Sequence, residues 1–129
     1  MSDADILEFV SGLPFEDTLE RVIAAIAQAE LILFSRIDHQ AGARDAGLDM
    51  PPATVLTYGH PKGGTPIMVA APLAALDLPL RVLIRARDDG QTAIAFHPIA
   101  ALLRRAGVPD ALAERLAPAQ QILVKAIMA

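Results

Sequence analysis

The sequence predicts an α+β fold, with a largely antiparallel sheet of about five or six strands and its helices packed on one face. Three observations lead to this prediction. An amphipathic helix lies near the N-terminus, two successive hairpin signals occupy the middle of the chain, and a helical apolar stripe runs to the C-terminus. Because no flexible linker or internal repeat interrupts the chain, residues 1–129 are expected to form one domain.

The N-terminal third contains one ambiguous segment and one clear helix. Ile6 to Val10 has a pattern that suits a short first strand or a helical turn. Apolar residues then recur on one helical face from Phe15 to Ile26, and acidic residues complement the first turn. These features predict a helix over Pro14 to Gln28.

The following segment predicts a buried strand and a short helix. Leu31 to Ile37 is apolar at nearly every position, which is typical of a strand buried on both faces. A short helix is expected over Ala41 to Ala46, ended by Gly47.

Two hairpins are predicted next. Thr54 to Tyr58 and Ile67 to Ala71 are expected to pair as strands around the glycine-rich turn Gly59 to Gly64. Pro72 to Pro79 is then an ordered connector, whose leucines are expected to be kept from water. The second hairpin joins Leu80 to Ala86 with Thr92 to Phe96.

Three arginines share one face of the strand Leu80 to Ala86 by parity, namely Arg81, Arg85 and Arg87. A solvated outer face is the expected reason, and a patch facing an anion or a second subunit is the alternative.

The C-terminal quarter predicts two or three helices. Pro98 and Pro109 each suit a first helical turn, and Gly107 ends the first of these helices. An apolar stripe continues to Ile127, and Pro118 kinks this helix or restarts it.

Composition excludes several classes of chemistry. The chain has 129 residues, and its 11 basic against 15 acidic side chains give a net charge of −4. The absence of cysteine excludes disulfides, thiol nucleophiles and iron–sulfur ligation. Without a basic stripe or an aromatic platform, nucleic-acid binding is not expected.

The same composition leads to expectations about location and assembly. The longest uncharged runs are broken by proline and fall short of the about 20 apolar residues that span a bilayer. The N-terminal residues lack the positive charge of a secretory signal, so a soluble, cytoplasmic protein is expected. A mean hydropathy of +0.41 suggests apolar surface hidden between subunits, which predicts a homodimer.

Four motifs in register give the sequence a family resemblance. They are the segments Ile37 to Ala43, Gly47 to Pro52, Tyr58 to Met68 and Leu76 to Leu80. In order and spacing they resemble the family catalogued as domain of unknown function 302, over roughly Phe15 to Gly107. The resemblance implies a TATA-binding-protein-like fold with a curved antiparallel sheet, and it implies no activity. The sequence departs from the family pattern at His60, where asparagine is usual.

The glycine-rich segment from Gly59 to Thr65 is the candidate binding site. It lacks the spacing of a P-loop, and a purely structural hairpin is the alternative. Its backbone N–H groups could form an anion-binding nest, with Lys62 and Thr65 as side-chain donors. Gly64 would resist substitution by valine if its φ angle is positive.

Two of the three histidines complete this candidate site. His39 and His60 both follow predicted strands, so folding could bring them together. The spacing of His39, His60 and His97 matches no metal-binding motif, and neither a metal nor a cofactor is expected.

Three functional hypotheses remain open. The first is a module that binds a small anionic or amphipathic ligand through His39, His60, Lys62, Gly64 and Thr65. The second is an enzyme that uses His39 or His60 as a general acid or base. The third is a homo-oligomeric interaction domain without a ligand.

Overall fold

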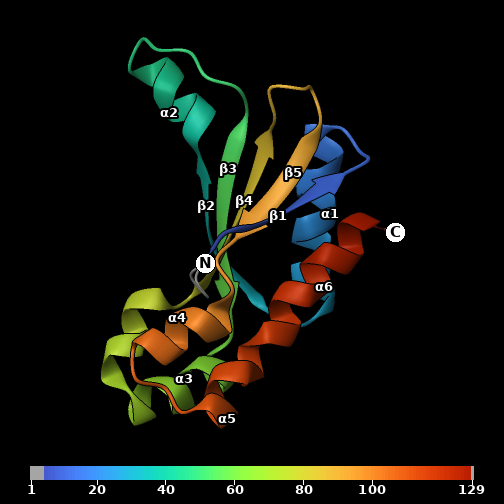
Figure 1. Cartoon of the computed structure of the whole chain (residues 1–129). Coiled ribbons are helices and arrows are strands. Elements are labelled where there is room, and N and C mark those ends of the chain that lie inside the picture. Colours follow the sequence, from blue (N-terminus) through green and yellow to red (C-terminus); the bar gives the residue numbers. More distant parts are fainter. Residues whose placement is uncertain (1–4, 129) are drawn as a thin grey trace.

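The protein folds around one five-stranded antiparallel sheet with the strand order β1-β5-β4-β3-β2 (Figure 1). The structure is a computed structural model and describes residues 5–128. The strands are β1 (Leu7–Ser11), β2 (Ile32–Asp38), β3 (Ala53–Gly59), β4 (Leu80–Ala86) and β5 (Thr92–Phe96). The α+β class predicted from the sequence is confirmed.

The helices form two groups around this sheet. They are α1 (Phe15–Gln28), α2 (His39–Asp45), α3 (Pro61–Ala70), α4 (Ile99–Arg105), α5 (Asp110–Ala113) and α6 (Ala117–Met128), with 3-10 turns η1 (Pro72–Asp77) and η2 (Glu114–Leu116). Figure 1 shows α1 and α6 together on one face of the sheet, with α3, α4 and α5 at one end of the strands and α2 at the other.

The core lies between the sheet and the pair α1 and α6. Alternate residues of β3 and β4 point into it, among them Leu56, Tyr58 and Val82, which are at most 1% exposed. Val22 and Ile26 of α1 belong to the same buried cluster. Burying each such aliphatic side chain contributes about 1.5–3 kcal/mol. Because every second residue of β3 and β4 points to this face, the sheet presents a continuous apolar surface against which α1 and α6 pack.

The best-predicted local element is the hairpin of β4 and β5. The strands pair antiparallel, with Ile84 opposite Ile94, and Gly90 takes a positive φ of 84° in the turn between them. The ambiguous first segment is a strand, β1, which pairs with β5. The predicted N-terminal and C-terminal helices are also present as α1, α4 and α6.

The predicted strand Ile67 to Ala71 is wrong, because this segment belongs to helix α3. Pro61 occupies the first turn, and the His60 Nδ1 atom accepts a hydrogen bond of 3.1 Å from the Lys62 N–H. Such a start favours a helix, although two glycines and Pro66 follow it. Ile67 is fully buried, so burial against the rest of the fold outweighs the poor helix propensity. β3 therefore pairs with β2 and β4 rather than with this segment.

The prediction that Leu31 to Ile37 is buried on both faces is also wrong. β2 is an edge strand, and Ile32, Leu33, Phe34 and Ile37 are each at least 36% exposed. An apolar run favours a strand with little solvent exposure, but it does not show whether the strand lies inside the sheet or at its edge.

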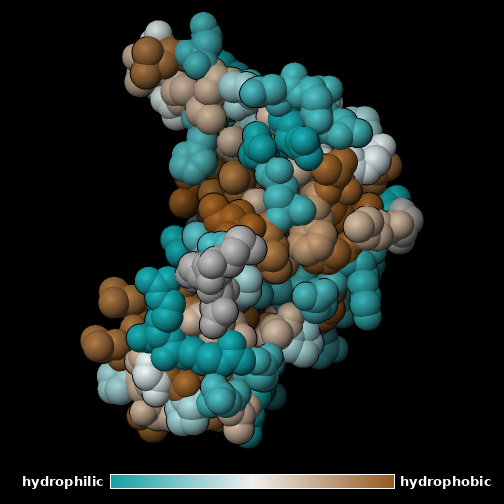
Figure 2. Space-filling model, viewed as in Figure 1, coloured by the Kyte–Doolittle hydropathy of each residue, from teal (hydrophilic) through white to brown (hydrophobic). Residues whose placement is uncertain are grey.

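Two of the three leucines of the predicted connector are not kept from water, whereas Leu78 is half-buried and packs against the core. Leu73 is 69% exposed and Leu76 is 83% exposed, and apolar atoms protrude over this segment at the lower left of Figure 2. The segment forms the 3-10 turn η1, in which residues three apart share a side. Because Ala74 is the buried residue of this turn, Leu73 and Leu76 both point outward.

Two of the three arginines lie on the face opposite to the helices, as parity predicts. Arg81 and Arg85 alternate with the buried residues of β4. Arg85 Nε donates a hydrogen bond of 2.9 Å to Glu8 Oε2 on β1, which ties the two strands across β5. Arg87 lies beyond the end of β4, and its guanidinium lies 3.2 Å from Asp89 Oδ2.

Candidate functional site

A cavity of about 790 Å³ lies where the end of β3 meets α3, the start of β4 and the start of α6. Its volume falls in the range of small-molecule pockets. Most of its wall is apolar. The large apolar side chains that line it are Leu31, Phe34, Met68, Leu78, Leu80 and Leu116.

The polar groups of this cavity come from β3 and α3. Thr57, Tyr58, His60 and Thr65 line it. The Thr57 hydroxyl already shares a hydrogen bond with the Ser35 hydroxyl, with 2.6 Å between Oγ1 and Oγ. The Tyr58 hydroxyl is different: it is buried and has no hydrogen-bond partner among residues 5–128. An unpaired buried hydroxyl costs about 1–3 kcal/mol, so this group is the polar atom that most needs a partner.

Burial raises the pKa of Tyr58 well above its ordinary value of 10.0. The unfolded state then ionises first, so the free energy of unfolding should fall as pH rises above about 10, by up to about 1.4 kcal/mol per pH unit. Tyr58 is the single tyrosine of the chain, so urea titrations of the native protein and of Tyr58→Phe isolate this loss. Parallel losses in the two proteins would contradict the prediction.

The N-terminus of α3 does not form the anion-binding nest that the sequence suggested. The Lys62 N–H donates to His60 Nδ1, and the N–H groups of Gly63 and Gly64 donate to the His60 carbonyl oxygen at 3.1 Å. These donors are already used within the turn. Because Nδ1 of the His60 ring accepts this hydrogen bond, a neutral ring carries its proton on Nε2. The Nε2–H group is then the hydrogen-bond donor that the His60 ring has left for a ligand.

The predicted site residues are only partly brought together. His60, Gly64 and Thr65 line the cavity, whereas Lys62 is exposed and lies outside its lining. His39 follows Asp38, which pairs with Thr54 at the far end of β3 from His60. At about 3.4 Å per residue the two histidines lie roughly 20 Å apart. The expectation that folding brings them together is wrong, because antiparallel pairing places their strand ends at opposite ends of the sheet.

Glycine shapes this cavity at two positions. Gly59 has a φ of 154°, which L side chains rarely adopt, and it turns the chain from β3 into α3. Gly64 lies in a helical segment without positive φ, so the condition for its predicted intolerance of valine is not met. A Cβ at Gly64 would lie 3.7 Å from both Leu78 Cδ1 and Met68 Cε, which is ordinary contact.

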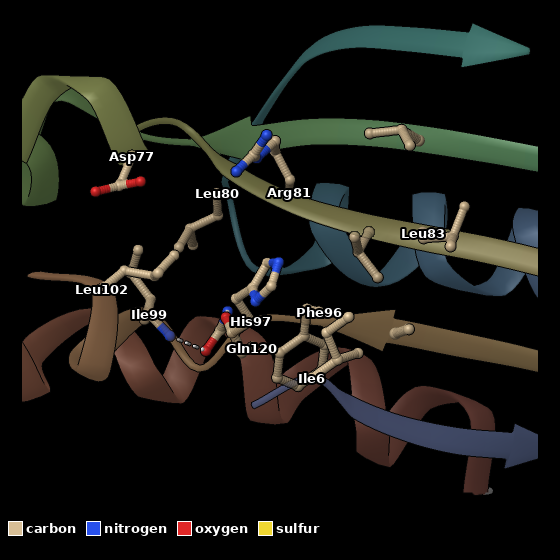
Figure 3. Close-up of a pocket in the computed structure, with 13 residues that line it drawn as sticks. Ile6, Asp77, Leu80, Arg81, Leu83, Phe96, His97, Ile99, Leu102 and Gln120 are labelled. Atoms are coloured by element: carbon tan, nitrogen blue, oxygen red, sulfur yellow. Dashed lines mark hydrogen bonds between the residues drawn. The ribbon is translucent and has the colours of Figure 1, made fainter. Parts of the chain in front are cut away.

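A smaller cavity of about 220 Å³ lies near the ends of β4 and β5 (Figure 3). Asp77, Arg81 and His97 line it, and Figure 3 shows these side chains around its centre. Gln120 also lines this cavity, and its side chain makes hydrogen bonds with the backbone of Ile99 and His97. The larger cavity has room for a small molecule, and Tyr58, whose buried hydroxyl has no partner among the described residues, belongs to its lining and not to that of the smaller cavity.

Residues 5–128 contain neither a metal-binding cluster nor a membrane-spanning helix. Within this part of the chain no three His, Cys, Asp or Glu residues come together in a way that could hold a metal ion. No helix in it combines the length and the apolar character needed to cross a bilayer.

Sequence reasoning missed Tyr58, the polar lining residue whose hydroxyl has no partner among residues 5–128. Tyr58 was predicted as the last residue of a strand and given no role at the site. The available signal was a lone tyrosine at an inward position of that strand, directly before a glycine-rich segment. Phe34 and Leu116 gave no comparable signal, because their approach to the cavity depends on tertiary packing.

Comparison with known proteins decides the family. The family model described as "Domain of unknown function DUF302" matches residues 7–129. The chain belongs to the DUF302 family. The resemblance seen in the sequence motifs is therefore confirmed.

Solved and curated proteins extend this comparison. The DUF302 protein from Bacillus stearothermophilus superposes with a TM-score of 0.81 at 18% identity, and 95% of each chain is covered. At this identity the likeness shows the fold alone. Curated relatives are the fluoride-specific ion channels FluC 1 of Brucella suis biovar 1 (strain 1330) and FluC 2 of Brucella melitensis biotype 1 (strain ATCC 23456), each 38% identical over 88 residues.

The DUF302 chain spans about a third of the length of these relatives. The match covers 68% of this chain and 34% and 32% of the two Brucella proteins.

Proposed function

We propose that this DUF302 domain binds a small amphipathic molecule, with an apolar body and a hydrogen-bond acceptor, in the larger cavity. One observation carries the proposal: Tyr58, whose hydroxyl is buried without a partner among the described residues, is part of the lining of an apolar cavity. A bound ligand whose acceptor reaches this hydroxyl would satisfy it.

The chemistry of the lining selects the ligand class. Tyr58, Thr65 and His60 line the cavity, and each carries a side-chain group that can donate a hydrogen bond. The apolar wall suits a hydrocarbon body. A carboxylic acid or ketone with a medium-length apolar tail meets both requirements, whereas an alkylammonium ion offers no acceptor.

The single tyrosine provides a direct readout. The chain has one tyrosine and no tryptophan, so its intrinsic emission comes from Tyr58 alone. Titration with straight-chain carboxylic acids of increasing length should change this emission and raise the melting temperature. The matching alkylammonium salts serve as the control for detergent-like effects. Equal responses to both series, or no response to either, would overturn the proposal.

A cavity-filling variant tests the location of the site. Gly64→Ala adds a methyl group against Leu78 and Met68 at the cavity wall. We expect weaker carboxylic acid binding with unchanged or higher stability, because alanine favours a helix over glycine by about 1 kcal/mol. Binding is measured by calorimetry and stability by urea unfolding.

Gly42→Ala in α2 is the matched control. A Cβ there would meet nothing within 4 Å, and Gly42 does not line the cavity. Its binding should equal that of the native protein. Unchanged binding by Gly64→Ala would remove the cavity as the site.

The proposal differs from the sequence-based binding hypothesis in giving Lys62 no role. Lys62 lies outside the cavity lining, so Lys62→Ala is expected to leave carboxylic acid binding unchanged. The channel name of the Brucella relatives describes proteins about three times as long as the shared segment, so channel activity is not proposed for this domain.

A further inference from the structure

The smaller cavity has two opposite charges in its lining that do not pair with each other. Asp77, the last residue of η1, and Arg81, the second residue of β4, both line it. Within residues 5–128 neither side chain takes part in an ion pair. One cavity therefore offers a ligand both a free carboxylate and a free guanidinium group.

The sheet sets the direction of the Arg81 side chain. Arg81 alternates with the buried Leu80 and Val82, so it projects from the face of the sheet opposite to α1 and α6. The pairing of β4 with β5, continued two residues beyond its last printed pair, places Arg81 beside His97 on this same face. Figure 3 shows both side chains at the cavity, one from β4 and one from just beyond β5.

A second wall of the cavity carries Asp77. The turn η1 packs against α4, and α4 supplies Leu102 to the same cavity. In Figure 3 Asp77 and Leu102 lie on one side of the space, and Arg81 and His97 lie on the other. Since the two charges stand on ordered elements, little backbone ordering is needed when a ligand bridges them.

We propose that the smaller cavity binds a small aliphatic amino acid in its zwitterionic form. The Arg81 guanidinium donates charge-assisted hydrogen bonds to the carboxylate of the amino acid, and the Asp77 carboxylate accepts hydrogen bonds from its ammonium group. Leu83 and Leu102 line the cavity and contact the hydrocarbon part.

The size of the cavity limits the ligand. Its volume of about 220 Å³ lies below the range of about 300–1,000 Å³ that is typical of drug-sized molecules. Liquid water occupies about 30 Å³ per molecule, so this space holds on the order of seven non-hydrogen atoms. An aminobutyric acid has this size.

Charge then selects the zwitterion among molecules of this size. A simple carboxylate would pair with Arg81 but would meet a like charge at Asp77, and a simple ammonium ion would meet a like charge at Arg81. Each mismatch lowers the affinity for the wrong ligand. A molecule that carries both charges gives each side chain a favourable partner.

This site is separate from the proposed carboxylic acid site. The linings of the two cavities share Leu80 alone, and the new inference does not rest on the proposed function. Gly64→Ala, which fills the larger cavity, should leave amino acid binding unchanged. The two proposals can therefore fail independently.

Binding by the native protein is the first test. The α, β and γ isomers of aminobutyric acid have one composition and differ in the distance between their charges. We titrate each isomer, butyrate and butylammonium into isotope-labelled protein and follow the NMR signals of the His97 and Leu102 amides. At least one isomer should bind about tenfold more tightly than both singly charged compounds. Failure of all three isomers to bind, or butyrate or butylammonium binding as tightly as the best isomer, would overturn the proposal.

Charge-neutralising variants test the two side chains. In Asp77→Asn the best isomer should bind about tenfold more weakly and lose its preference over butyrate, because no carboxylate remains to receive the ammonium group. In Arg81→Gln the preference over butylammonium should be lost in the same way. A ratio of two dissociation constants does not depend on the folded fraction, so this readout separates recognition from a loss of stability.

Matched controls make the same charge changes elsewhere. Asp49→Asn and Arg105→Gln alter exposed residues outside the lining of the smaller cavity. Both should keep the affinity and the preference of the native protein. An unchanged preference in Asp77→Asn or Arg81→Gln, or an equal loss in the controls, would show that these two side chains do not hold the ligand.

Discussion

Tyr58→Phe is expected to make the ligand-free protein more stable and ligand binding weaker. The substitution removes only the hydroxyl, which is buried without a partner among the described residues. Removing an unsatisfied buried group should raise the free energy of unfolding by about 1 kcal/mol. If a carboxylic acid accepts a hydrogen bond from this hydroxyl, its dissociation constant should rise about fivefold to tenfold.

The two effects have opposite signs, which makes this variant informative. Urea unfolding gives the stability, and calorimetry gives the binding, because the variant lacks the tyrosine emission. Thr18→Val is the control for removing a buried hydroxyl that has partners: Thr18 Oγ1 lies 2.8 Å from Ser11 Oγ and 3.0 Å from the Pro14 carbonyl oxygen. It should lose about 1 kcal/mol of stability and keep ligand binding. A less stable Tyr58→Phe protein, or one with unchanged binding, would contradict the role given to this hydroxyl.

The largest loss of stability is expected for Gln120→Leu. The Gln120 side chain is 4% exposed and joins α6 to the junction of β5 and α4. Its Oε1 accepts a hydrogen bond of 3.0 Å from the Ile99 N–H (Figure 3). Its Nε2 donates one of 2.9 Å to the His97 carbonyl oxygen. Leucine has a similar size but leaves both backbone groups unpaired, at a cost of about 2–4 kcal/mol.

The neighbouring residue provides the control. Gln121 is exposed on the same helix, so Gln121→Leu should change the free energy of unfolding by less than about 0.5 kcal/mol. Urea unfolding of the two variants compares a buried with an exposed glutamine in one helix. Equal stabilities would show that the Gln120 bonds contribute little.

For the fold, sequence reasoning succeeds where the interactions are local. The pairing of β4 with β5 follows from alternation and from Gly90, and α1 follows from its apolar stripe. It fails where distant packing outweighs local preference. The residues of α3 resemble a turn and a strand, and only the His60 cap and the burial of Ile67 make them a helix.

The candidate site shows the same division. Of the candidate residues in the glycine-rich segment, His60, Gly64 and Thr65 line one cavity, and their ligand role stays a prediction. His39 was assigned to the same place because both histidines follow strands, a similarity that ignores strand direction. Tyr58 was missed because the absence of a partner for its hydroxyl depends on every residue packed around it.

The sequence by itself determined the α+β class, the family, the main hairpin and the loop that borders the cavity. Tertiary structure decided the order of the strands, and with it the exposure of β2 and the separation of His39 from His60. The physical reason is that side-chain periodicity reports how much of an element is buried. It carries no information on which distant element covers it, since that depends on the packing of the whole chain.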